Sequence, residues 1–313
     1  MATLAQPDPP PHAEPHHGRH PRRLTAISLL PAAATLGNLL CGFLVLFCCL
    51  LAVRATFASQ TPLLHPWMQL FPSHLAAGAY LIFLAMIFDA LDGRLARITR
   101  RTSEFGAQLD SLADIVSFGV APAALLVTMQ LLLRPVPSEP PEPDLHRLQF
   151  RVGMACALVY VSCAGIRLAR FNVENVRSEA GQKAFSGLPS PGAAAAIASL
   201  LALHENLRST GYALWGVDWA DVSRWLISGT ALVVGFLMVS RLDYMHVFNV
   251  YIRRKHPPTH LLWPILVLGI AWYNFELLLV VLALAYVISG VVLHLRRRPA
   301  AGSPPPPSLR TLP

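Results

Sequence analysis

The chain has 313 residues, of which 54% are hydrophobic and only 13% are charged. This composition excludes an ordinary soluble domain and is typical of a protein that crosses a membrane several times. The net charge of +8 is explained by loops that face anionic lipid headgroups, so we expect no nucleic acid partner. The five cysteines lie in apolar runs, and we expect buried side chains without a disulfide framework.

A membrane-spanning helix needs about 20 apolar residues, and we predict eight such segments. The first six are expected at Ile27–Val53, Leu75–Leu95, Phe105–Leu133, Val152–Ala169, Leu188–Leu203 and Trp225–Ser240. The apolar block Leu261–Leu295 is too long for one span and breaks near Asn274, so we divide it into two. The predicted fold class is an all-α integral membrane protein with about eight transmembrane helices.

These spans divide the chain into four parts. Residues 1–23 and the proline-rich residues 299–313 are predicted to be disordered tails. Residues 24–245 form a core of about six spans, and residues 246–298 hold the last two. With the N-terminus inside, 19 of the 25 Lys and Arg residues fall in inside segments. The positive-inside rule therefore predicts that both termini are cytoplasmic, and we expect the plasma membrane as the location.

Four carboxylates lie near the predicted cytoplasmic ends of the second and third spans: Asp89, Asp92, Asp110 and Asp114. Ionisable side chains in membrane segments are costly and usually have a function. Residues three or four apart share one face of a helix, so each pair is expected to form one patch. Because like charges repel when they are packed together, these oxygen ligands indicate a hard divalent cation such as Mg²⁺, Mn²⁺ or Ca²⁺.

The residues around the carboxylates favour a phosphate or pyrophosphate ligand. Gly93 and Gly106 allow a ligand to approach the backbone, and Arg97 lies one turn after Gly93. Metal ions neutralise phosphate oxygens, and a carboxylate that is not fully used by metal can accept a proton from an attacking hydroxyl. Ion pairing of the carboxylates with neighbouring arginines as structural support is the alternative interpretation.

The complete pattern resembles the signature of the CDP-alcohol phosphatidyltransferases. It consists of Asp89, Asp92, Gly93, Ala96, Arg97, Gly106, Asp110 and Asp114. A CDP-alcohol phosphatidyltransferase fold is what this resemblance implies. It further implies that the four Asp residues bind two divalent ions, Mg²⁺ or Mn²⁺, and that Asp114 is the general base. The other four residues, with Asp89, Asp92 and Asp110, would bind the CDP moiety.

Three further segments resemble one subgroup, the membrane-integral CDP-diacylglycerol–serine O-phosphatidyltransferases. They are residues 167–173 (RLARFNV), residues 185–194 (FSGLPSPGAA) and residues 30–39 (LPAAATLGNL), the last with Ala32 where the subgroup usually has Asn. The resemblance implies CDP-diacylglycerol and L-serine as substrates, phosphatidylserine and CMP as products, and a homodimer. Arg167, Arg170 and Asn172 are candidates for binding the acceptor or a phosphate. From spacing alone, the two arginines could equally be ordinary side chains at a membrane boundary.

Other functions are weighed against this interpretation. Glycerol 3-phosphate or an inositol phosphate as acceptor, as in a phosphatidylglycerophosphate synthase, would need extra cationic groups for a second phosphate. A divalent-cation transporter could use the same carboxylates, but they cluster at one face, the motif is not repeated, and the glycines would have no role. A structural membrane protein would not explain four carboxylates.

Overall fold

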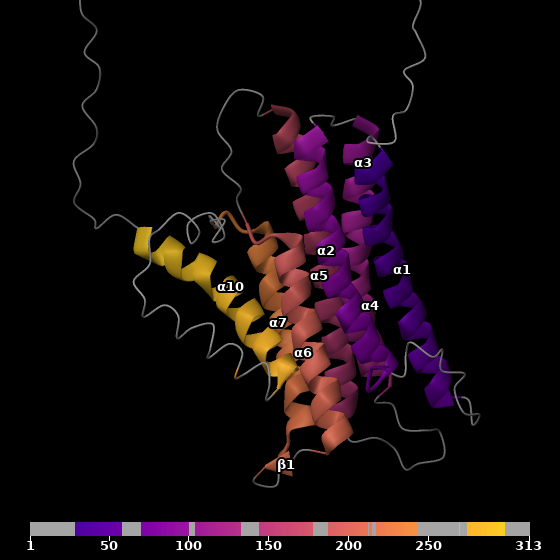
Figure 1. Ribbon diagram of the computed structural model, residues 1–313. Helices are drawn as coiled ribbons and strands as arrows, with labels where there is room; N and C mark the ends of the chain where they lie inside the picture. The colour runs from indigo at the N-terminus through magenta and orange to yellow at the C-terminus, as the bar shows by residue number, and fades with distance from the viewer. Residues whose placement is uncertain are drawn as a thin grey trace, which may run out of the picture.

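The computed structural model describes residues 29–57, 70–99, 104–132, 144–177, 187–211, 213–214, 217–242, 269 and 274–297. In these residues the protein is a bundle of long helices (Figure 1). A two-residue antiparallel hairpin, β1 (Ala213–Leu214) and β2 (Val217–Asp218), joins two of the helices. The all-α fold class predicted from the sequence is therefore confirmed.

The helices follow the predicted spans closely. They are α1 (Leu29–Phe57), α2 (His74–Thr99), α3 (Glu104–Asp114), the π-helix η3 (Ile115–Val120), α4 (Ala121–Leu131), α5 (Asp144–Arg177), α6 (Ser190–Thr210), α7 (Trp219–Val239) and α10 (Phe275–Arg297). Within the described residues, six segments are long and apolar enough to cross a membrane: Pro31–Thr56, His74–Leu95, Phe105–Leu131, Arg147–Glu174, Val222–Val239 and Phe275–Leu295. The protein is thus a multi-pass membrane protein.

Two parts of the topology stay predictions. The segment between Leu261 and Asn274, expected to hold the seventh span, lies outside the described residues apart from Gly269. The tails at 1–23 and 299–313 also lie outside them. The count of eight spans and the cytoplasmic position of both termini therefore rest on the sequence.

α6 was predicted as the fifth span but is not among the six apolar segments. It packs against α2, α7 and α10, and it also contacts η3. Its residues from Gly192 to Ala202 are all buried. A helix enclosed by protein does not need the long apolar side chains that lipid contact favours, so α6 is rich in alanine instead.

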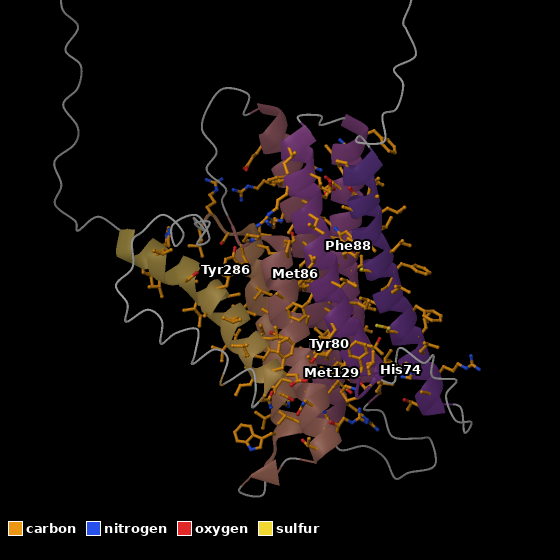
Figure 2. The ribbon with its side chains drawn as sticks, viewed as in Figure 1. His74, Tyr80, Met86, Phe88, Met129 and Tyr286 are labelled. Atoms are coloured by element: carbon orange, nitrogen blue, oxygen red, sulfur yellow. The ribbon has the colours of Figure 1, made fainter. Side chains whose placement is uncertain are left out.

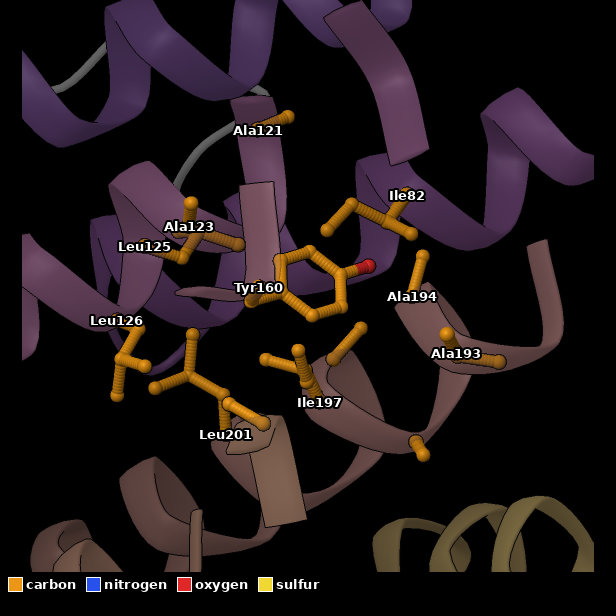
Figure 3. Close-up of a cluster of buried hydrophobic side chains, with 14 of the residues drawn as sticks. Ile82, Ala121, Ala123, Leu125, Leu126, Tyr160, Ala193, Ala194, Ile197 and Leu201 are labelled. Carbon is orange, nitrogen blue, oxygen red and sulfur yellow. The ribbon is translucent and has the colours of Figure 1, made fainter. Parts of the chain in front are cut away.

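The core is centred on Tyr160 of α5. Its ring is fully buried among side chains of neighbouring helices, including Ile82, Ile197 and Leu201 (Figure 3). The Tyr160 hydroxyl donates a 2.7 Å hydrogen bond to the backbone carbonyl of Phe118 in η3. A buried tyrosine requires such a partner for its hydroxyl, and this bond attaches α5 to the π-helical segment.

α3, η3 and α4 follow one another without a break, so the predicted third span is a single helix with a π-helical segment in its middle. The wider turn begins directly after Asp114. π-helical turns are rare and frequently occur at functional sites. Helix α1 packs closely against this segment, because Gly42 of α1 lies against the backbone of Ser117.

Replacing Gly42 with alanine is expected to destabilise the protein by about 1–3 kcal/mol, because overpacking costs that much in a close-packed interior. The added Cβ would lie 2.6 Å from Ser117 Oγ and 3.0 Å from Ser117 Cα. Thermal unfolding of the purified protein in detergent measures the effect. Gly229→Ala is the matched control, since its Cβ would meet no described atom within 4 Å, and it should stabilise α7 by up to about 1 kcal/mol. Equal melting temperatures for the two variants would contradict the close packing of α1.

Candidate active site

Three of the predicted carboxylates meet at one end of the bundle. One carboxylate oxygen from each of Asp89, Asp110 and Asp114 lies within 4.8 Å of the others. Asp89 follows Phe88 in the second half of α2 (Figure 2), and the other two residues belong to α3. All three side chains are partly buried. Asp110 and Asp114, which are four residues apart on one helix, therefore share a cluster with Asp89.

Asp92 lies one turn beyond Asp89 on α2 but is not part of this three-residue group. Its side chain is only 8% exposed, and it accepts a hydrogen bond from the hydroxyl of Thr35 on α1. A buried carboxylate needs such donors to offset the loss of its hydration. α1 thus supplies a neutral partner to the second acidic residue of the motif.

Asn38 gives α1 a second contact with the cluster. Its side-chain amide donates a 3.1 Å hydrogen bond to Asp114 Oδ1, and its backbone carbonyl accepts a 2.8 Å bond from Ser117 Oγ. The Asn38 side chain is fully buried, and its Oδ1 has no hydrogen-bond partner among the described residues. The sequence analysis assigned no role to Thr35 or Asn38. Two polar residues three apart on one face of an apolar span were the available signal.

Arg167 is the predicted cation that the structure brings to the carboxylates. It lies on α5, and its guanidinium is within electrostatic range of Asp89 and Asp114. Its Nη1 also donates a hydrogen bond to the hydroxyl of Ser190, the first residue of α6. Ser190 is completely buried. The guanidinium is therefore held between the acidic cluster and the start of α6.

Arg170, three residues later, is placed differently. Its Nε forms a 2.8 Å ion pair with Glu174 Oε1, and its Nη1 donates a 3.4 Å bond to the carbonyl of Val239 at the end of α7. Asn172 lies on the α3 side of α5, where its Oδ1 accepts a 3.2 Å hydrogen bond from Ser111. The two candidate arginines therefore have different partners: Arg167 bonds Ser190 of α6 near the carboxylates, whereas Arg170 bridges α5 and α7.

The remaining motif residues surround the same end of α2 and α3. Gly93 follows Asp92, and a Cβ there would meet no described atom within 4 Å, so no described side chain packs at that point of α2. Gly106 is half-buried on α3, one turn before Asp110. Ala96 and Arg97 belong to the last turns of α2, but their side chains lie outside the described part of the chain.

The donor set fits a divalent metal ion. It consists of carboxylate oxygens, the ligands that Mg²⁺, Mn²⁺ and Ca²⁺ prefer. Oxygens on opposite sides of one ion are about 4.2 Å apart for Mg²⁺ and up to about 5.2 Å apart for Ca²⁺, so separations within 4.8 Å allow one ion to contact all three residues. A metal ion would also neutralise the mutual repulsion of the three carboxylates. The cluster could therefore hold a metal ion.

An apolar helical bundle that carries such a cluster defines a membrane-embedded protein with an acidic site among its helices. Comparison with known families specifies the class further. Residues 28–237 match the family model of the CDP-alcohol phosphatidyltransferases. Because this match covers more than half of the 313 residues, the chain belongs to that family of transferases.

Similar proteins come from archaea and bacteria. A protein of Methanocaldococcus jannaschii is 30% identical over 218 residues, which cover 69% of this chain and 83% of that protein. A Mycobacterium leprae protein is 35% identical over 56% of this chain and 51% of its own length, and a Helicobacter pylori protein is 37% identical over 53% and 59%. All three are named CDP-diacylglycerol–serine O-phosphatidyltransferase. The chain spans little more than half the length of the latter two.

Asp110→Asn is expected to weaken binding of Mn²⁺ by at least about tenfold, because even supporting residues around metal ligands contribute that much. The variant replaces a carboxylate of the three-residue cluster with a neutral amide. Titration of the detergent-solubilised protein with Mn²⁺, followed by electron paramagnetic resonance of the free ion, measures the affinity. Glu174→Gln is the matched control, since it removes a carboxylate that pairs with Arg170 outside the cluster. Equal affinities for both variants would contradict a metal site at Asp110.

Proposed function

We propose that the protein transfers the phosphatidyl group of CDP-diacylglycerol to the hydroxyl of L-serine, giving phosphatidylserine and CMP. The observation that carries this proposal is the meeting of Asp89, Asp110 and Asp114 beside Arg167. An acidic cluster suits a metal-bound diphosphate, and a neighbouring guanidinium suits the carboxylate of an amino acid. The names of the similar proteins support serine as the acceptor.

The four Asp residues would hold the cofactor, which we propose to be two divalent ions, Mg²⁺ or Mn²⁺. Such ions would neutralise charge on the diphosphate of the lipid substrate. Thr35 and Asn38 keep Asp92 and Asp114 in place from the opposite helix through their hydrogen bonds. The carboxylates thus keep one arrangement as substrates bind and leave.

The CDP moiety is proposed to lie over the end of α2 and the beginning of α3. Gly93 leaves room at the backbone for the nucleotide, as described above. Gly106 of α3, Ala96 and Arg97 would complete the pocket. Asp89, Asp92 and Asp110 would contact the diphosphate. This arrangement leaves the acyl chains in the bilayer and the charged headgroup at its boundary.

Asp114 is the proposed general base. Its carboxylate accepts the proton of the serine hydroxyl as the serine oxygen forms a bond with the phosphorus that bears the diacylglycerol. The bond between that phosphorus and the bridging oxygen of CMP breaks, and CMP leaves with the electron pair. The hydrogen bond from Asn38 to Asp114 Oδ1 orients the carboxylate, so its other oxygen is available to the acceptor.

Arg167 is the proposed partner of the serine carboxylate, because its planar guanidinium can form two parallel hydrogen bonds with it. Arg170 and Asn172 lie further along α5. We propose that Arg170 contacts the lipid phosphate and that Asn172 contacts the serine ammonium. We further propose that the site faces the cytoplasm, that the protein lies in the plasma membrane, and that it forms a homodimer.

Purified protein in detergent with Mn²⁺ is expected to release CMP from CDP-diacylglycerol only when L-serine is added. Asp114→Asn should lower kcat by about 10²- to 10⁴-fold, the range that a general base contributes. Glycerol 3-phosphate and an inositol phosphate, offered separately, test the alternative acceptors. Release of CMP with either of these acceptors but not with serine would refute the proposed substrate. Release with none would favour a cation transporter.

Arg167 and Arg170 are expected to differ when each is replaced by lysine. Arg167→Lys should raise KM for serine by at least about tenfold, because it loses charge-assisted bonds with fixed geometry. Arg170→Lys should change KM by less than about fivefold, since its ion pair with Glu174 is partly exposed and such pairs contribute little. Steady-state kinetics with varied serine measures both effects. A larger effect at Arg170 would reverse the assignment.

A further inference from the structure

α10 lies outside residues 28–237, the part of the chain that matches the family. It packs along α6 at one edge of the bundle (Figure 1). At its beginning, Glu276 Oε1 accepts a 2.9 Å hydrogen bond from the Tyr80 hydroxyl of α2, and the ring of Phe275 stacks on Tyr80 with 6.4 Å between centroids. These contacts fix the end of α10 that is remote from the carboxylates.

Tyr286 lies ten residues after Glu276, which corresponds to about 15 Å along a helix. In Figure 2, Tyr286 lies near the level of Phe88, whereas Tyr80 lies further down the bundle. Its ring contacts the first turn of α6: a Cβ at Gly192 would lie only 2.6 Å from Tyr286 Cε1. Gly192 therefore allows α10 to approach α6 at this level.

This contact is two residues from Ser190, whose hydroxyl accepts the hydrogen bond from Arg167. The phenol of Tyr286 and the guanidinium of Arg167 are also within electrostatic range of each other. Arg167 thus bonds Ser190 and interacts electrostatically with both the carboxylate cluster and Tyr286. Both Ser190 and Tyr286 are placed by the packing of α6 against α10.

We infer that Tyr286 is a positioning residue for Arg167, and that α10 thereby contributes to binding of the acceptor. This inference rests on the proposed function, since it assigns to Arg167 the carboxylate of serine. An arginine side chain loses considerable conformational freedom when it is fixed, and holding it before the substrate arrives lowers that cost at the moment of binding. A phenol beside the guanidinium and a serine hydroxyl bonded to it restrict it in this way.

The test compares two Tyr→Phe substitutions. Tyr286→Phe removes a hydroxyl of α10, and Tyr80→Phe removes the hydroxyl of α2 that bonds Glu276 of α10. Tyr286→Phe is expected to raise KM for serine about fivefold, the equivalent of one neutral hydrogen bond, while KM for CDP-diacylglycerol and kcat change less than about twofold. Tyr80→Phe is the matched control, because it breaks the bond to Glu276 at the remote end of α10. It should leave KM for serine unchanged. Thermal unfolding of both variants identifies any general loss of stability.

A second variant tests the contact itself. Gly192→Ala keeps the Tyr286 hydroxyl but places a methyl group where the ring lies, so it should also raise KM for serine. Combined with Tyr286→Phe, it should add less than the sum of the single effects, because both variants disturb the same group. An unchanged KM for serine in Tyr286→Phe, with an active parent enzyme, would overturn the inference. Absence of serine-dependent CMP release in the parent enzyme would instead refute the proposed function.

Discussion

The site depends on concentrating negative charge at one end of an apolar bundle. Asp89, Asp110 and Asp114 approach within 4.8 Å of one another, although like charges repel and burial removes their hydration. The surrounding structure compensates in two ways. α1 supplies neutral donors through Thr35 and Asn38, and α5 supplies a cation. A bound metal ion would supply the remaining positive charge.

Close helix packing makes this arrangement possible. The donors of α1 reach the carboxylates because α1 has glycine where α2 and η3 press against it: a Cβ at Gly37 would lie 2.8 Å from Phe88 Cδ1, and one at Gly42 would lie 2.6 Å from Ser117 Oγ. Ser117 belongs to the π-helical turn that follows Asp114, and it donates to the carbonyl of Asn38. The irregular turn and the glycines of α1 therefore form one contact that sets the distance between α1 and Asp114.

The sequence predicted the features that depend on the helical period and missed those that depend on packing between distant segments. The spacing of the Asp residues sufficed to place Asp89 and Asp110 on facing patches. Thr35 and Asn38, by contrast, form hydrogen bonds with residues that are 57 and 76 positions away along the chain. No local sequence pattern indicates these partners. Arg167 and Arg170 are separated by about 60° around a helix, and α6 and α7 border α5 on these two sides. One arginine therefore bonds Ser190 and the other contacts Val239.

α6 is not among the six apolar segments found in the described residues, although it lies inside the bundle. Hydropathy measures how well a helix tolerates lipid, whereas α6 is enclosed by α2, α7, α10 and η3. Being enclosed, it can hold small residues and still lie at the centre of the bundle. This position brings its first residue, Ser190, to Arg167. The acidic cluster from α2 and α3 thus lies near one cation, Arg167 of α5, which Ser190 of α6 holds through a hydrogen bond. In the proposed reaction, the acidic cluster holds the metal ions of the diphosphate, and Arg167 binds the carboxylate of the acceptor. α6 holds Arg167 through Ser190, so it contributes to this reaction together with the acidic motif.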